Sequence, residues 1–154
     1  METILIASDH GGFGLKERLK TYLKKSGFLV KDLGAHSKDS CDYPVFAARL
    51  AQAVSQKKFK RGILICKSGI GNSIVANRFP GVRAALCYNT VAARLSREHN
   101  DSNVLVMGSI FVNPVLAKRI IKVWLSTKFE GGRHLRRLKR IRGIEKELIC
   151  KAKK

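Results

Sequence analysis

One cysteine stands in a stretch whose residue types and spacing suit catalysis. Residues 62–73 read Gly-Ile-Leu-Ile-Cys-Lys-Ser-Gly-Ile-Gly-Asn-Ser. The apolar run that ends at Cys66 has no polar alternation, which predicts a strand buried on both faces. Gly69 and Gly71 then permit a tight turn with positive φ, and the residues from Ile74 onward suit a helix. We therefore expect Cys66 at the carboxyl end of a central strand, just before a helix N-terminus.

This expected position of Cys66 favours an ionised sulfur. Free N–H groups and the helix dipole at a helix N-terminus stabilise negative charge. A thiol placed there tends towards thiolate, the form that acts as a base or a nucleophile. A glycine turn after a buried structural cysteine has the same local pattern, so the rest of the chain must decide between the two interpretations.

The elements that would position this cysteine alternate between strand and helix. Strands are predicted at residues 3–7, 28–30, 63–66, 83–87 and 103–107, and helices around 15–23 and 46–54 and at 74–79, 91–98 and 114–125. Lys and Arg fill the other faces of the first helix. This order predicts one α/β domain, a Rossmann-like open parallel five-stranded sheet with helices on both faces. Ligands of such a sheet bind beyond the carboxyl ends of its strands.

The composition is that of a single domain with a sizeable core. The chain has 154 residues, 45% of them hydrophobic, which is enough to fill one core. Its cysteines show neither Cys-x-x-Cys nor zinc-binding spacing, and a chain with this much core needs no disulfide framework. We expect a reducing, cytoplasmic setting, with no signal peptide and no membrane span.

The charge of the chain is strongly positive. Lys and Arg total 31 against 11 acidic residues, a formal net charge of +20. Such an excess suggests phosphorylated small molecules, nucleic acid or another anionic surface as partners, although a generally basic proteome has the same effect. Nonspecific binding to polyanions is expected in either case.

The C-terminal segment, residues 131–154, predicts a basic helix and tail. Its apolar residues form a stripe: Leu135, Leu138, Ile141, Ile144 and Leu148. Because the predicted sheet is already covered, packing on a second subunit would bury this stripe. A last helix docked on its own domain is the alternative.

Five short motifs occur in order along the chain. They are Ser-Asp-His-Gly-Gly at 8–12, Asp-Tyr-Pro at 42–44, Ile-Cys-Lys-Ser-Gly-Ile-Gly-Asn-Ser at 65–73, Ser-Arg-Glu-His-Asn-Asp at 96–101 and Phe-Glu-Gly-Gly-Arg-His at 129–134. Together they closely resemble ribose-5-phosphate isomerase of type B, in the sugar-phosphate isomerase family that includes galactose-6-phosphate isomerase subunits. The resemblance spans nearly the whole chain.

The resemblance implies interconversion of ribose 5-phosphate and ribulose 5-phosphate through an enediolate, a reaction of the pentose phosphate pathway, with no cofactor and no metal. Moving the carbonyl between C1 and C2 needs a base for the C2 proton, donors for the oxyanion and an acid that opens the furanose ring. By resemblance Cys66 is the base and His99 is the ring-opening acid.

The resemblance also implies the substrate-binding residues. Asp9 and His10 would hold sugar hydroxyls, and the guanidinium groups of Arg133 and Arg137 would bind the phosphate. The other predicted substrate-binding residues are Lys67, Ser68, Gly69, Ile70, Gly71 and Asn100, with Tyr43 and Ser73 in support. Taken singly, many of these could be helix caps or solvated charges, so the assignment rests on the set.

The cysteine loop departs from the family's Cys-Gly-Thr-Gly-x-Gly pattern. Ser68 keeps the hydroxyl of the usual threonine, whereas Lys67 puts a long cation beside the sulfur. That cation could point to solvent, favour the thiolate or meet the substrate's charge. One branch of the family uses a carboxylate at the position of Asn72 instead of the cysteine. Because an amide cannot be that base, Cys66 is the only candidate.

The resemblance points to a homodimer, with a tetramer left open. If the C-terminal helix packs on a neighbour, one chain would supply Cys66 and the other Arg133 and Arg137. Other functions stay open, including isomerisation of a six-carbon sugar phosphate such as allose or galactose 6-phosphate. The loop also resembles the Cys-x5-Arg-Ser loop of a cysteine phosphatase, but with Asn72 at the place of the arginine. The basic C-terminal helix could instead belong to a nucleic-acid-binding module.

Overall fold

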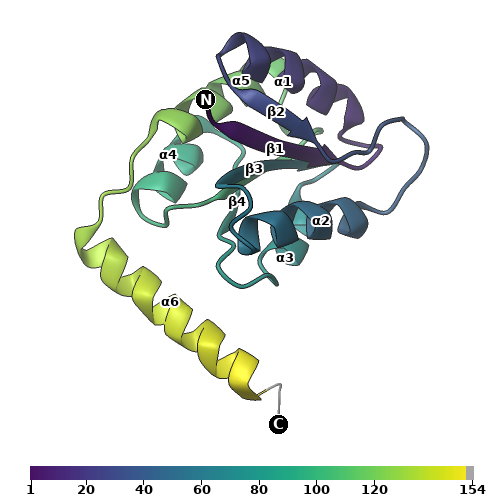
Figure 1. The fold of residues 1–154 in the computed structure, drawn as a ribbon. Helices are drawn as coiled ribbons and strands as arrows, with labels where there is room; N and C mark the ends of the chain where they lie inside the picture. Colours follow the sequence, from purple (N-terminus) through teal and green to yellow (C-terminus); the bar gives the residue numbers. More distant parts are fainter. Residues whose placement is uncertain (152–154) are drawn as a thin grey trace.

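Five parallel strands form one sheet at the centre of the molecule (Figure 1). The computed structural model describes residues 1–151. The strands are β1 (Thr3–Ser8), β2 (Leu29–Asp32), β3 (Arg61–Cys66), β4 (Ala84–Leu86) and β5 (Val104–Gly108). They lie in the order β2-β1-β3-β5-β4, and every neighbouring pair is parallel. The predicted open five-stranded α/β sheet is confirmed.

The three central strands are buried because helices cover both faces of the sheet. Along β3, Ile63 and Ile65 pack into the core on one face and Leu64 into the core on the other. Because side chains on both faces of the strand are buried, apolar residues occupy every position and do not alternate with polar ones. This arrangement explains the continuous apolar run before Cys66.

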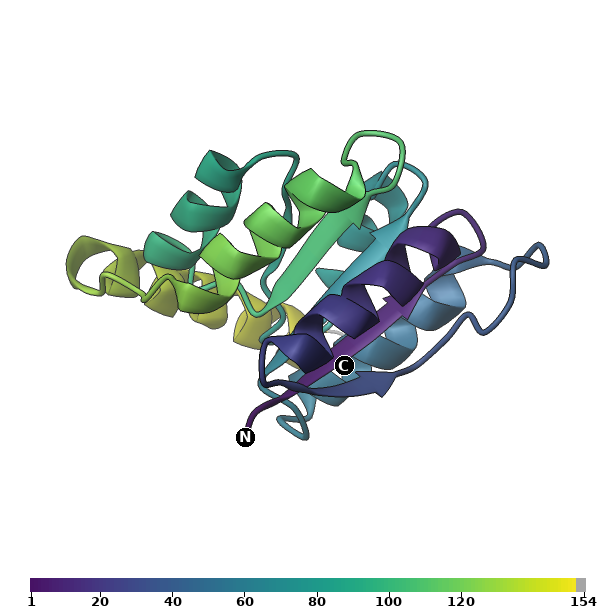
Figure 2. The same cartoon turned by 90° about the horizontal axis from the view of Figure 1, so that it is seen from above.

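Helices form one layer on each face (Figures 1 and 2). One layer contains α1 (Phe13–Lys25), α4 (Thr90–Glu98) and α5 (Pro114–Ser126), and its core includes the fully buried Trp124. The indole N–H of Trp124 donates to Ser102 Oγ at 2.7 Å, which pairs its only polar atom. The other layer contains α2 (Tyr43–Ser55) and α3 (Ile70–Ala76).

The third helix begins earlier than the sequence predicts. The prediction placed it at 74–79, but α3 begins at Ile70, directly after Gly69. Gly69 has the expected positive φ, 83°, whereas Gly71 lies inside the helix, so the prediction of a positive φ at Gly71 is wrong. Position 71 needs a glycine for a different reason: a Cβ there would lie 2.4 Å from Cζ of Tyr43, so only glycine leaves room for that ring.

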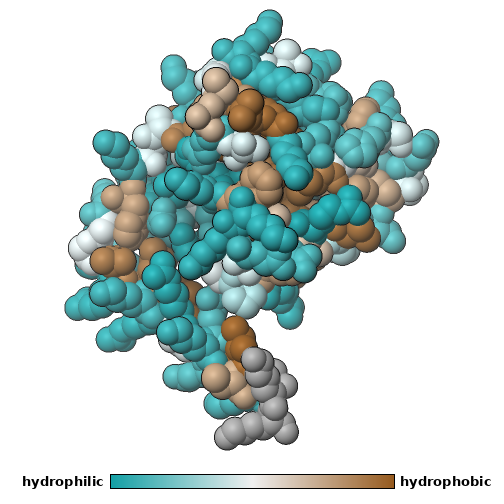
Figure 3. Space-filling view, viewed as in Figure 1, coloured by the Kyte–Doolittle hydropathy of each residue, from teal (hydrophilic) through white to brown (hydrophobic). Residues whose placement is uncertain are grey.

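The last helix, α6 (Gly132–Lys151), extends away from the two layers (Figure 1). Its first half is anchored by the buried His134 and Leu138, and in its second half Glu145 accepts the backbone N–H of Gly81 at 3.1 Å. The rest of the predicted apolar stripe is exposed, from 40% at Leu135 to 63% at Leu148. Figure 3 shows brown groups among hydrophilic ones along α6. The end of the predicted basic tail, 152–154, lies outside the described residues.

No helix within residues 1–151 is both long enough and apolar enough to cross a membrane.

Candidate active site

Cys66 is the last residue of β3, at the carboxyl edge of the sheet. Its exposed fraction is 4%, and the backbone N–H of Gly69 donates to its Sγ at 3.1 Å. A hydrogen bond donated to sulfur favours the thiolate over the thiol. The predicted placement of Cys66, at a strand end and just before a helix, is confirmed.

The turn after Cys66 provides donors as well as space. A Cβ at Gly69 would lie 2.4 Å from Cδ1 of Leu86, so both its backbone conformation and its packing require glycine. The N–H groups of Gly71 and Asn72, in the first turn of α3, donate no hydrogen bond to any described residue. Such free N–H groups can bind the oxygens of an anionic intermediate.

Asp9 and His10 follow β1, which is paired with β3 next to Cys66. The buried Asp9 accepts the N–H of Gly12 on Oδ1 at 2.9 Å. Nδ1 of His10 lies 3.1 Å from the backbone nitrogen of Cys41 and 3.2 Å from its carbonyl oxygen, so Cys41 engages this side of the ring. The exposed side chain of His10 keeps its other ring nitrogen, Nε2, for a sugar hydroxyl.

Four more predicted residues lie on or beside the turn. The ring of Tyr43 lies against the backbone of Gly71, and Ser68 Oγ accepts the N–H of Ile70 at 3.3 Å. Ser73 donates its hydroxyl to the carbonyl of Ile70 at 2.8 Å, which commits that hydroxyl to α3. Lys67 is exposed and forms no ion pair within residues 1–151.

Asn72 is more deeply placed than its loop position suggests. Its side chain is 1% exposed, and Oδ1 has no hydrogen-bond partner among the described residues. A buried acceptor without a partner is costly unless a ligand or a water supplies the donor. The sequence marked Asn72 as the position where one branch of the family has a carboxylate, but it did not predict the burial of this side chain.

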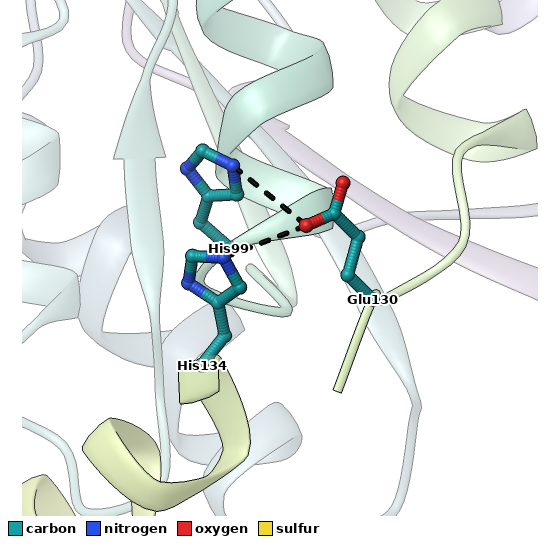
Figure 4. A group of neighbouring side chains, drawn as sticks. All are labelled: His99, Glu130 and His134. Atoms are coloured by element: carbon teal, nitrogen blue, oxygen red, sulfur yellow. Dashed lines mark ion pairs between the residues drawn. The ribbon is translucent and has the colours of Figure 1, made fainter. Parts of the chain in front are cut away.

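A second polar cluster gathers around His99, which caps the C-terminus of α4 (Figure 4). The rings of His99 and His134 are stacked, with centroids 4.2 Å apart and an interplanar angle of 6°. Oε2 of Glu130 lies 3.5 Å from Nε2 of His134 and 4.0 Å from Nε2 of His99. No role was predicted for Glu130 or His134, although both lie in the motif at 129–134.

The phosphate-binding candidates lie on the same helix as His134. Arg133 donates from Nε to Nε2 of His134 at 3.4 Å, and Arg133, Arg137 and Asn100 are all exposed. Burial lowers the pKa of His134, and the positive charges of His99 and Arg133 lower it further. Glu130 opposes this shift, so the His134 ring lies between one carboxylate and the positive charges of Arg133 and Arg137.

The two clusters lie at opposite ends of the sheet. The pairing of β3 with β5 sets Cys66 beside Gly108 at the carboxyl end and Gly62 beside Val104 at the amino end. His99 follows α4 and comes shortly before β5, so it lies on the amino side of that strand. Four residues of strand span about 13 Å. Within one chain, His99 and the arginines therefore do not reach Cys66.

Comparison with known proteins identifies the family. A sequence model described as ribose/galactose isomerase matches residues 4–141, nearly the whole chain. The chain belongs to this family. Ribose-5-phosphate isomerase B of Escherichia coli is 45% identical to it over 145 residues, which are 94% of this chain and 97% of that protein.

Solved structures agree with this membership of the ribose/galactose isomerase family. Ribose-5-phosphate isomerase B of Clostridium thermocellum superposes with a TM-score of 0.93 at 48% identity, covering 95% of this chain and 99% of the other. The enzyme of Mycoplasma genitalium, solved with bound ribulose-5-phosphate, gives 0.90 at 41% identity, covering 94% and 97%. The resemblance predicted from the five motifs is confirmed.

Proposed function

We propose that this protein is a ribose-5-phosphate isomerase that interconverts ribose 5-phosphate and ribulose 5-phosphate. The observation that carries the proposal is the buried sulfur of Cys66, held by the N–H of Gly69 at 3.1 Å beside unused N–H groups. These are the parts that an enediolate mechanism needs. The similarity to a structure with bound ribulose-5-phosphate supports the choice of substrate.

In the proposed mechanism His99 acts first, on the cyclic sugar. It takes the proton of the O1 hydroxyl and gives a proton to the ring oxygen, which breaks the C1–O4 bond and frees the C1 aldehyde. The half-buried side chain of His99 is 36% exposed, which leaves part of its ring accessible to a sugar. Imidazole suits this step because it gives and takes protons near neutral pH.

Cys66 then carries out the isomerisation. The thiolate removes the C2 proton, the C1–C2 double bond forms, and O1 receives the electron pair of the former carbonyl. The free N–H groups of Gly71 and Asn72 would stabilise this oxyanion. The thiol returns the proton to C1, and the O2 proton passes to O1, which yields the C2 ketone and leaves Cys66 as thiolate.

We further infer that the complete site forms between two chains. Two observations support this: the two clusters lie at opposite ends of β3, whose residues Gly62 and Cys66 are about 13 Å apart, and the apolar stripe on α6 is exposed. If that stripe is buried on a second copy of the chain, Arg133 and Arg137 would lie beside Cys66 of that second copy. Burying an aliphatic side chain contributes roughly 1.5–3 kcal/mol, enough in sum to hold two small, positively charged subunits together.

A substrate panel tests the proposal. Purified protein is given ribose 5-phosphate, allose 6-phosphate or galactose 6-phosphate, and the appearance of the ketose is followed. We expect the highest kcat/KM with ribose 5-phosphate. Faster turnover of a six-carbon sugar would replace this substrate, and no turnover of any of the three would overturn the proposed function.

A cysteine phosphatase is the less favoured alternative. That chemistry needs an arginine against the phosphoryl group, and the corresponding side chain here is the buried, uncharged Asn72. Release of inorganic phosphate in the same panel would support it.

A further inference from the structure

We propose that the side chain of Asn72 binds the C2 hydroxyl of the sugar phosphate. This inference rests on the proposed function and deepens it, because it names the part of the substrate that one side chain recognises. The amide oxygen of Asn72, Oδ1, is buried and has no hydrogen-bond partner among residues 1–151. In the proposed mechanism only the backbone N–H of Asn72 has a role, so its side chain is still unexplained.

Asn72 lies on the face of α3 that packs against the sheet. The buried residues of this helix are Asn72 and Ala76, which are four positions apart and therefore share a face. Ala76 belongs to the core between the sheet and the layer of α2 and α3, together with Leu64 of β3. Because α3 begins just after the carboxyl end of β3, Asn72 lies one turn nearer to that edge of the sheet than Ala76 does.

The side chain of Cys66 lies in the same layer. Side chains alternate along a strand, so Cys66 shares a face of β3 with Leu64, two residues earlier. Only the turn at Gly69, whose N–H donates to the sulfur at 3.1 Å, separates Cys66 from the start of α3. The amide of Asn72 and the sulfur of Cys66 are therefore at the same end of one layer, and a substrate held against the sulfur lies beside the amide.

An amide is a costly side chain at this position. Asn72 is 1% exposed, and a buried acceptor without a partner destabilises the fold relative to an apolar side chain of the same size. Asn77, at the C-terminus of the same helix, has the usual arrangement. Its amide donates to the carbonyls of Ser73 and Ala84, each at 3.0 Å, and accepts the N–H of Ala84 at 2.9 Å. A donor supplied by the substrate would explain the unpaired oxygen of Asn72.

The type of partner that Oδ1 lacks identifies the substrate group. Cys66 is the proposed base for the C2 proton, so the hydroxyl on C2 is also close to the sulfur and to the amide. Oδ1 needs a donor, which the C2 hydroxyl provides and the C1 carbonyl of the open-chain sugar does not. A hydrogen bond from this hydroxyl to Oδ1 would hold the C2 hydrogen towards the sulfur, which is the orientation that proton removal needs.

Asn72 lies just beneath the surface of the site. Gly71 and Ser73, on either side of it, are half-buried, and Ile70 is 50% exposed. A small rotation of the amide towards this edge of the sheet would let it meet a bound sugar.

Calorimetry with two sugar phosphates tests the contact. The parent protein carries Cys66→Ala, so that ribose 5-phosphate is not converted, and 2-deoxyribose 5-phosphate is the matching ligand without the C2 hydroxyl. We expect the parent to bind ribose 5-phosphate about tenfold more tightly than the deoxy sugar, the contribution of one hydrogen bond. Asn72→Leu should remove this preference by weakening the binding of ribose 5-phosphate. Asn72→Ala, which cannot clash, should do the same, whereas Asn72→Asp keeps an acceptor oxygen and should keep the preference.

Urea unfolding gives a second measurement, which needs no substrate. Leucine is close to asparagine in size and has no unpaired acceptor, so Asn72→Leu should raise the midpoint of unfolding. In the otherwise wild-type enzyme the same change should lower kcat/KM for ribose 5-phosphate about tenfold. Asn77→Leu is the matched control. It removes three paired hydrogen bonds, so it should lower the midpoint and leave the preference for the C2 hydroxyl unchanged.

The outcomes separate this inference from the proposed function. If Asn72→Leu and Asn72→Ala keep the preference of the parent, another group binds the C2 hydroxyl and the inference is overturned, while isomerase activity of the wild type keeps the proposed function. If the wild type has no isomerase activity and the parent binds neither sugar phosphate, the proposed function is overturned and the inference with it.

Discussion

The backbone N–H of Gly69 points at the sulfur of Cys66, with 3.1 Å between nitrogen and Sγ. The left-handed φ of Gly69 turns this N–H back towards the end of β3. A negative charge on the sulfur is stabilised by a donor that is fixed before substrate binds.

Replacing the sulfur should stop the reaction and leave binding intact. We expect Cys66→Ala to abolish conversion of ribose 5-phosphate, because no carboxylate stands at the position of Asn72 to take the C2 proton. Calorimetry should still detect substrate binding. More than a small residual turnover would remove Cys66 from the role of base.

Cys87 provides the matched control, since it is also a buried cysteine near the end of a strand. Burial raises the pKa of the Cys87 thiol to about 11, so it stays protonated at neutral pH and cannot act as a base. Cys87→Ala should therefore keep its turnover.

The sheet and the place of Cys66 could be predicted because the signals are local. An apolar run such as Ile63–Cys66, followed by glycines, specifies a buried strand and a turn whatever lies around it. Lys16 shows the limit of such reasoning. Helical spacing puts Lys and Arg on the outer faces of α1, yet Lys16 is fully buried, because Asp32 of β2 meets its Nζ at 2.6 Å.

The cluster around His99 could not be placed from the sequence either, because it too depends on contacts between segments far apart in the chain. The stacking of His99 on His134 depends on how the chain turns before α6, and the left-handed φ values of Gly131 and Gly132 set that turn. Motif spacing identified His99 but not its distance from Cys66. That distance follows from the direction of α4, which returns the chain to the amino end of the sheet.

The Asp32 carboxylate should make the free energy of unfolding depend on pH in the acidic range. Burial alone would raise the pKa of Asp32, but hydrogen bonds from Lys16, Lys20 and the N–H of Gly34 outweigh it and lower the pKa below 3.8. A folded-state pKa below the unfolded one adds stability above the unfolded pKa, and this is lost as pH falls through the folded pKa. Urea unfolding at a series of pH values should therefore show stability declining below about pH 4.

Removing the charge of Asp32 should destabilise the fold at neutral pH. Asp32→Asn leaves Lys16 buried with only Glu17 as its ion-pair partner, and we expect a loss of about 3 kcal/mol in the free energy of unfolding. Asp39→Asn is the control, because Asp39 is exposed and bonds only to Ser37. Equal losses in both variants would contradict the role given to the Lys16–Asp32 pair.

A methyl group at Gly71 should disturb the ring of Tyr43. Alanine favours a helix over glycine by about 1 kcal/mol, yet a Cβ at Gly71 would lie 2.4 Å from Tyr43 Cζ. We expect Gly71→Ala to destabilise the fold and to raise KM, and Tyr43→Ala to relieve the clash in the double variant. Gly14→Ala, where no atom lies within 4 Å, should be tolerated. Additive effects of Gly71→Ala and Tyr43→Ala would show that the two sites do not interact.

Subunit exchange tests whether sites are shared between chains. Cys66→Ala and Arg137→Ala proteins should each be nearly inactive, since one lacks the base and the other a phosphate ligand. In a mixed dimer with shared sites, one of the two pockets keeps both residues. Equal mixing makes half of the dimers mixed, so activity should return to about a quarter of the wild type.

The control pair combines Cys66→Ala with Asp9→Asn. Cys66 ends β3 and Asp9 follows the neighbouring strand β1, at the same edge of one chain's sheet, so every pocket of their mixed dimer lacks one of them. This mixture should stay inactive while the Cys66→Ala and Arg137→Ala mixture recovers. Exchange itself is followed by mass spectrometry of differently tagged chains. If exchange occurs and neither mixture recovers, Cys66 and Arg137 serve the same pocket from one chain, and α6 must then fold back across the sheet in solution.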